Sequence, residues 1–134
     1  MKKRYIVIPA AAALLLGICA MDSVLPEGFD KNQIFHTAKD FLRELNRRDY
    51  RSCCRYFSAD MLQANSPDRL AAAFDPIFDT LGAFVCFRGQ SVSVQKSAED
   101  DYVLCVVRCQ YENNSADFSI TFDRSMQISG LSVK

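Results

Sequence analysis

The sequence has one histidine, His36, and none of the closely spaced cysteine pairs that zinc knuckles and dithiol redox centres use. A single histidine excludes a histidine-based metal cluster within one chain. Cys53 and Cys54 are adjacent, and Cys105 and Cys109 are four positions apart, so neither pair has the spacing that such sites need. We therefore predict no metal site and no cofactor, and interpret His36 as a surface or boundary residue.

An excess of positive charge is also missing. The chain carries 16 lysines and arginines against 16 aspartates and glutamates. The one basic cluster, between Arg43 and Arg55, is interrupted by Glu44 and Asp49, and it fits a solvated helical face as well as an anion site. Nucleic-acid binding needs a concentrated positive surface, so the sequence excludes this class of partner.

No apolar run reaches the roughly 20 residues that a membrane-spanning helix needs. The longest begins at Tyr5, ends at Cys19, contains Pro9 and follows the basic residues 2–4. A basic segment, then a short apolar segment and small residues, is the plan of a secretory signal peptide. We predict a signal peptide over residues 1–20, cleavage after Ala20 and export. Loss of its three positive charges takes the net charge from 0 to about −3.

Lipid attachment at Cys19 is the alternative to simple cleavage. Leu16 and Gly17 suit a lipobox, whereas Ile18 stands where a small residue is the norm. The exported protein is therefore either free or envelope-associated, and it contacts the membrane only through the signal or a Cys19 lipid.

Five of the six cysteines lie beyond this leader. In an oxidising compartment an odd number leaves at least one thiol unpaired. Cys105 and Cys109 lie about 13 Å apart in an extended strand at ~3.3 Å per residue, too far to bridge. A bridge from Cys86 to either of them, a bridge from Cys53 or Cys54 to the sheet, and reduced thiols acting as small apolar residues all stay open.

Helical periodicity dominates the first half of the domain. After a tether over residues 21–30, it predicts helices over 31–46 and 50–57 and a third that begins at Pro67. Asp30 with Gln33 forms a capping box, Ser66 caps the third helix and Gly82 ends it.

From residue 84 the period changes to that of strands, which are predicted over 84–95, 102–111, 118–122 and 128–133. In the strongest strand, residues 102–111, we expect the odd-numbered side chains from Val103 to Tyr111 to face the core. Helices followed by an antiparallel meander predict one α+β domain over residues 31–134, with the N-terminal helices packed on one sheet face.

Several motifs, weak singly but specific in their order, resemble one known family. They are Phe41-Leu42, Asn46-Arg47-Arg48-Asp49-Tyr50, Tyr56-Phe57-Ser58 with Met61, Leu81-Gly82-Ala83-Phe84, Val106-Val107 with Cys109 and Tyr111, Phe122-Asp123 and Ile128-Ser129-Gly130-Leu131. The chain resembles, over about residues 31–133, the small bacterial domain-of-unknown-function family 3887. The resemblance implies a nuclear-transport-factor-2-like (cystatin-like) fold, in which helices close a curved sheet into a cone. The extra cysteines depart from the family pattern.

The predicted cone can bind an apolar small molecule or be packed solid by its own side chains. The candidate lining residues are Tyr56, Phe74, Phe78, Phe84, Cys86, Cys105, Cys109, Tyr111 and Phe122. On the opposite face of the sheet, Tyr102, Leu104 and Val106 form a candidate homodimer surface.

No spacing specifies an acid–base pair, so we assign no catalytic residue. The preferred hypothesis is an exported, non-enzymatic interaction or small-ligand-binding module. The alternative is a small enzyme, of isomerase, hydratase or hydrolase-accessory type, that uses a polar group inside the cone. Its candidates are Tyr56, Tyr111, Asp75 and Asp79.

Overall fold

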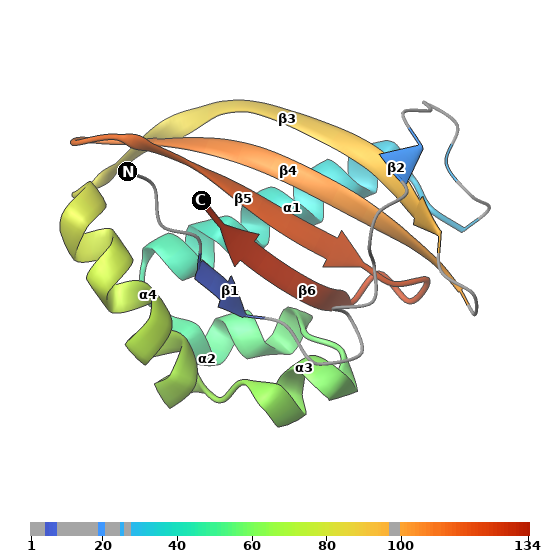
Figure 1. The fold of residues 1–134 in the computed structure, drawn as a ribbon, viewed down its shortest axis with the longest axis horizontal. Helices are drawn as coiled ribbons and strands as arrows, with labels where there is room; N and C mark the ends of the chain where they lie inside the picture. Colours follow the sequence, from blue (N-terminus) through green and yellow to red (C-terminus); the bar gives the residue numbers. More distant parts are fainter. Residues whose placement is uncertain (1–4, 8–18, 21–24, 26–27, 97–99) are drawn as a thin grey trace.

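The computed structural model describes residues 5–7, 19–20, 25, 28–96 and 100–134, and in it the helices precede the long strands (Figure 1). The helical elements are α1 (Lys31–Asn46), α2 (Tyr50–Cys53), the 3-10 helix η2 (Cys54–Tyr56), α3 (Ala59–Ala64) and α4 (Pro67–Leu81). The strands are β1 (Tyr5–Val7), β2 (Cys19–Ala20), β3 (Phe84–Lys96), β4 (Asp101–Tyr111), β5 (Ser115–Phe122) and β6 (Ile128–Val133). This order confirms the predicted α+β fold.

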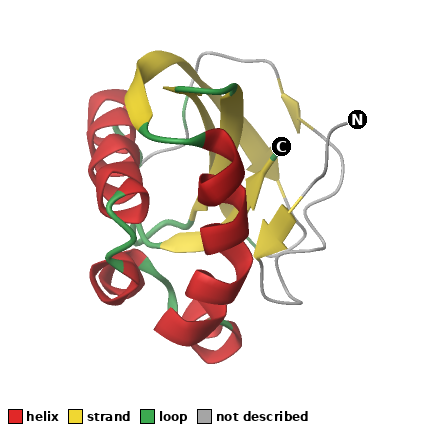
Figure 2. Ribbon diagram, turned by 90° about the vertical axis from the view of Figure 1, so that its left-hand side faces the viewer, coloured by secondary structure: helices red, strands yellow, loops and turns green. Residues whose placement is uncertain are grey.

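The sheet is a meander in which β3, β4, β5 and β6 are successive antiparallel neighbours, within the order β1-β6-β5-β4-β3-β2. Its long strands curve over the helices, which gather on one face (Figure 2). In β4 the side chains of Val103, Cys105, Val107 and Cys109 are fully buried, and Tyr111 is 2% exposed. The predicted alternation along β4 is therefore confirmed, because its odd-numbered residues face the helices.

Local capping sets the bounds of the two long helices. Asp30 accepts a hydrogen bond from the backbone N–H of Asn32 at 3.0 Å, and α1 has the predicted bounds. Ser66 accepts one from the backbone N–H of Arg69 at 3.2 Å, with Pro67 in the first turn of α4, where its missing N–H costs nothing. A capping box at Asp30 and Gln33 predicts two contacts, and the structure shows the one in which the Asp30 side chain accepts from the backbone.

The predicted helix over 50–57 was wrong at its end, and α3 was missed. The helix tightens into η2 and stops because Phe57 is extended and bridges Ile128 of β6. The backbone N–H of Ser58 donates to the carbonyl of Ile128 at 2.9 Å, and the Ser58 hydroxyl caps α3 by accepting from Met61 at 3.3 Å. Local periodicity cannot reveal this contact, because the strand lies about 70 residues further along the chain.

Side chains fill the space between the sheet and the helices. Phe74 is fully buried, with its ring centroid 5.9 Å from that of Phe78 and 6.5 Å from that of Phe118 on β5. The ring centroids of Phe41 and Phe57 lie 5.8 Å apart in the same core. Among the residues that the structure describes, the centre of the predicted cone is thus a packed aromatic core.

The predicted signal peptide and tether fall largely outside the described residues. Within the described segments, β1 pairs with β6 and β2 pairs with β3, while Leu25 and Phe29 pack partly against the core. The side chain of Cys19 lies outside what the structure describes. No helix in the described part of the chain has both the length and the hydropathy to cross a membrane.

Candidate functional site

A cleft of about 370 Å³ opens where the C-terminal ends of α1 and α4 meet the start of β3 and the end of β4. Its polar side chains are Asn46, Arg48, Asp79 and Tyr111. The rings of Phe78 and Phe84 form apolar walls, and Gly82 and Ala83 join the two. The exposed lining of the cleft is mainly polar, because Phe78 is 4% exposed and Phe84 is half-buried.

Arg48 enters the cleft from a left-handed backbone position. Arg48 has a φ of 61° and follows the end of α1. Its backbone N–H donates to the carbonyl of Leu45 at 2.9 Å, and the backbone N–H of Asp49 donates to the carbonyl of Glu44 at 3.1 Å. This is the Schellman closure of a helix, a position that usually takes glycine. An arginine here costs about 1 kcal/mol of backbone strain.

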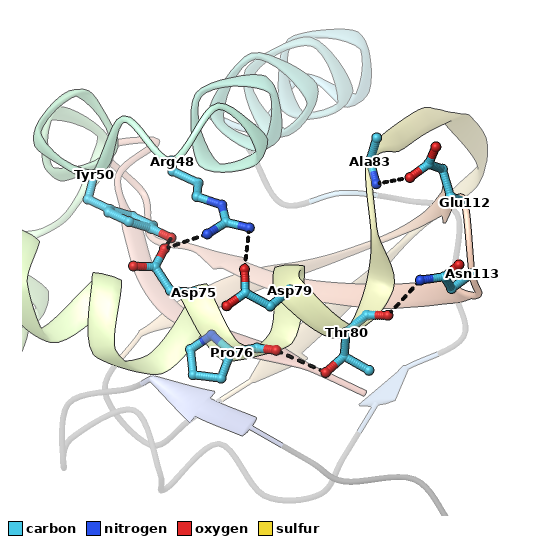
Figure 3. A network of polar contacts seen from close by, with 9 residues as sticks. All are labelled: Arg48, Tyr50, Asp75, Pro76, Asp79, Thr80, Ala83, Glu112 and Asn113. Atoms are coloured by element: carbon cyan, nitrogen blue, oxygen red, sulfur yellow. Dashed lines mark hydrogen bonds and ion pairs between the residues drawn. The ribbon is translucent and has the colours of Figure 1, made fainter.

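The guanidinium of Arg48 joins two carboxylates of α4 (Figure 3). It donates to Asp79 at 2.9 Å and to Asp75 at 3.5 Å, and it lies 5.9 Å from the centroid of the Phe78 ring. Tyr50 donates its hydroxyl to Asp75 at 2.6 Å. The hydrogen bond to Asp79 raises the pKa of Arg48, and burial together with Asp75 raises that of Tyr50. Both therefore act as fixed donors.

The β4–β5 turn holds the wall of the cleft that Gly82 and Ala83 form. Gly82 has φ of 84° and ψ of −163°, a region that residues with a Cβ hardly enter. The side chain of Glu112 accepts from the backbone N–H of Ala83 at 2.9 Å, and Asn113 donates to the carbonyl of Thr80 at 3.0 Å (Figure 3). These bonds tie the end of α4 to the sheet.

Asn46 and Tyr111 meet at the inner end of the cleft. The Tyr111 hydroxyl donates to Oδ1 of Asn46 at 2.5 Å. Burial raises the pKa of Tyr111, so this hydroxyl keeps its proton. Nδ2 of Asn46 is buried, yet it finds no acceptor among the described residues. A buried donor without a partner is costly, so this amide marks a place where a bound group can add stability.

Comparison with known proteins identifies the family. The sequence profile of the protein family of unknown function DUF3887 matches residues 38–131. The chain belongs to this family. An NMR structure of a protein from Ruminococcus gnavus ATCC 29149 superposes on the DUF3887 chain with a TM-score of 0.72 and 22% identity, covering 86% of this chain and 98% of that one. That similarity shows a shared fold. No curated protein matches the sequence.

The cleft of this chain contains three of the predicted lining residues, Phe78, Phe84 and Tyr111. The others lie elsewhere. Phe74, Cys105, Cys109 and Phe122 are fully buried in the packed core. Tyr56 lines a separate cleft of about 250 Å³ on the helical side, with Glu44, Ser52 and Arg55.

Placing Cys86 in the interior was wrong, because its side chain is exposed. The pairing of β3 with β4 shifts register between Phe84 and Cys86, which displaces the alternation that a regular strand would have. Cys86 lies opposite Gln110, on the other face from the buried Cys109. The five cysteines whose side chains the structure describes are free, so of the alternatives left open by the sequence it shows the reduced thiols.

Sequence patterns missed Asn46 and Arg48 as site residues. Both were visible only as part of a motif after the first helix, because nothing local reveals that α4 brings Asp79 to them. The signal that could have singled out Arg48 is its place: a charged residue at a helix end that usually takes glycine.

The buried thiols are poor nucleophiles. Burial raises the pKa of Cys105 to about 12 and that of Cys109 to about 12, so neither forms a thiolate near neutral pH. In the described segments, no three histidine, cysteine, aspartate or glutamate side chains gather as a metal site would require.

The predicted dimer surface is a narrow strip. Tyr102, Leu104 and Val106 are half-buried on the outer face of β4. Their cross-strand neighbours are the polar residues Ser91, Ser93, Gln95, Ser119 and Thr121. A strip one strand wide is smaller than a stable interface, which buries about 800 Å² on each partner. The homodimer stays a prediction.

Proposed function

We propose that this DUF3887 protein is an exported, non-enzymatic module that binds a small ligand in the cleft between α1, α4 and β3. The observation that carries the proposal is the unmatched amide of Asn46, buried beside the rings of Phe78 and Phe84. A curved sheet covered by helices fits the nuclear-transport-factor-2-like cone that the family resemblance implies (Figure 1). The cleft lies where α1 and α4 end.

This proposal moves the ligand from the centre of the cone to its end. The apolar interior is occupied by Phe74, Phe118 and their neighbours, whereas the cleft combines rings with hydrogen-bonding groups. The ligand is therefore an amphipathic small molecule rather than a purely apolar one.

The enzyme alternative has support in the presence of Tyr111 and Asp79 in one cleft. The state of these groups favours binding over catalysis. Tyr111 keeps its proton and donates it to Asn46, and Asp79 is engaged by Arg48 at 2.9 Å. A general base must be deprotonated and free of competing donors, whereas Tyr111 is protonated and Arg48 competes for Asp79.

The binding role is tested by narrowing the cleft. Ala83→Leu puts an isobutyl group where the cleft wall is made by a methyl group, and Ala72→Leu adds the same group on the exposed face of α4. In two-dimensional NMR of the purified protein with a mixed library of neutral, cationic and anionic small molecules, we expect wild type and Ala72→Leu to show shifts confined to Gly82, Ala83 and Phe84. Ala83→Leu should lose them.

A library that shifts no resonance of the cleft in wild type would contradict the binding proposal. Equal shifts in Ala83→Leu and Ala72→Leu would place the ligand elsewhere on the protein.

Export rests on the basic residues 2–4 followed by an apolar run. Expressed with its full leader in a bacterium, the protein should appear outside the cytoplasm with Met21 as its first residue. Intact-mass spectrometry of the fractionated protein reads this directly. A mass that includes a lipid on Cys19 would replace free secretion by anchoring, and an uncut chain in the cytoplasm would end the export proposal.

A further inference from the structure

The charges around the cleft largely satisfy one another. Arg48 is shared by Asp75 and Asp79, and Tyr50 adds a hydrogen bond to Asp75. Arg48 is the cation among the described residues that line the cleft, and an anionic ligand would have to compete with its two carboxylate partners. The cleft therefore favours a neutral ligand over a phosphate or a carboxylate.

The Asn46 amide favours a ligand that carries a hydrogen-bond acceptor. Its Nδ2 needs an acceptor, which an ammonium or guanidinium ligand does not have. Turning the amide over would exchange the two atoms, so that Oδ1 would take the place of Nδ2 and would need a donor instead of an acceptor. A hydroxyl group on the ligand satisfies either orientation, because it both accepts and donates a hydrogen bond.

Asp79 favours a ligand that also carries a hydrogen-bond donor. Its side chain is 68% exposed at the rim of the cleft, and Arg48 engages only Oδ1. The carboxylate therefore retains acceptor capacity for a ligand donor. A hydroxyl group accepts from Asn46 and donates to a carboxylate, whereas a carbonyl only accepts and an ammonium only donates.

The Phe84 ring in the wall of the cleft favours a ligand with an apolar face next to its polar groups. The Phe84 ring is half-buried and is fixed edge-on against Tyr111 at 5.7 Å and tilted against Phe87 at 5.0 Å. A rigid ring at a cleft wall is a platform for a flat apolar surface. A pyranose has such a surface in its C–H face and carries hydroxyl groups around its rim.

We propose that the cleft binds a neutral saccharide, with a sugar ring against Phe84 and neighbouring hydroxyl groups toward Asn46 and Asp79. The volume of about 370 Å³ lies at the small end of ligand sites and accommodates a small ring rather than a long chain. This inference rests on the proposed binding function and names its ligand class.

The test compares classes of probe on the purified protein. Glucose, galactose and N-acetylglucosamine are titrated at millimolar concentration beside choline and acetate, and the NMR resonances of Gly82, Ala83 and the Asn46 side-chain amide are followed. We expect shifts with at least one saccharide and none with acetate. Saturable shifts with choline or acetate but with no saccharide would overturn the saccharide assignment while leaving the binding function intact. No shifts with any probe would overturn it as well.

Asn46→Asp separates the saccharide from a cationic ligand. Aspartate retains an acceptor for Tyr111, but it removes the donor and adds negative charge. Saccharide affinity should fall roughly tenfold, from the loss of one hydrogen bond to a buried group. Affinity for a cation should rise instead. Asn32→Asp, at the exposed start of α1, makes the same chemical change away from the cleft and should leave both affinities unchanged.

Phe84→Leu supplies an independent arm in case Asn46→Asp does not fold. Leucine keeps an apolar side chain but removes the ring face, so saccharide affinity should fall several-fold with the domain still folded by circular dichroism. Unchanged saccharide affinity in Phe84→Leu would contradict the stacked arrangement.

Discussion

Replacing Phe74 with alanine should lower the free energy of unfolding by about 3–5 kcal/mol. Phe74 is fully buried between Phe78 of the same helix and Phe118 of β5, so its loss leaves a cavity that neighbouring elements can only partly close. Urea denaturation followed by circular dichroism measures the change. The result bears on function because Phe74 is one of the candidate lining residues for the alternative in which the cone is hollow.

Leu62→Ala is the matched control for this truncation. The Leu62 side chain is 47% exposed on α3, so its removal should change the unfolding free energy by about 0.5–1 kcal/mol. A loss in Phe74→Ala no larger than that of Leu62→Ala would mean that Phe74 faces unfilled space. Binding of an apolar ligand inside the cone would then be a better hypothesis than binding of a ligand in the cleft.

Replacing Gly82 with alanine should cost about 2–4 kcal/mol. Two effects add. The backbone, at φ of 84° and ψ of −163°, lies where a Cβ is strained, and that Cβ would meet Oε1 of Glu112 at 3.0 Å and Nδ2 of Asn113 at 3.2 Å. Those two side chains hold the end of α4 to the sheet, so relief by moving them would break the bonds to Ala83 and Thr80.

Two other glycines separate these effects. Gly28 has φ of 96° and no atom within 4 Å of an added Cβ, so Gly28→Ala reports backbone strain alone. Gly89→Ala, with open space and an ordinary φ, should leave stability within about 0.5 kcal/mol of wild type. Thermal denaturation of all three variants gives the comparison. A loss in Gly82→Ala no larger than that in Gly28→Ala would show that the clamp by Glu112 and Asn113 is not rigid, and one no larger than that in Gly89→Ala would contradict both effects.

The long elements were predictable because their patterns are local. In α1, the apolar residues recur every three or four positions and Asp30 caps the start, and both features act within one turn of backbone. In β4, alternation of buried and outward side chains follows from the pleat. Neighbours in sequence determine these choices, so the sequence was sufficient to predict them.

The errors arose where partners distant in sequence decide the geometry. Phe57 leaves the helical path because Ile128 pairs with it, and Cys86 turns outward because β3 shifts register against β4. The cleft itself is such a case, since Arg48 follows α1 and Asp79 lies on α4. No periodicity within either helix specifies that the two side chains meet.

By itself, the sequence determined the α+β order of elements, the inward face of β4 and the family, because propensity, capping and alternation depend on residues a few positions apart. Only the tertiary structure decided that aromatic side chains fill the interior and that the open space lies at the end of the helices, beside Asn46 and Arg48. Whether a space is filled depends on how side chains from separate elements pack, and the packing of Phe74 against Phe118 exists only once the chain has folded.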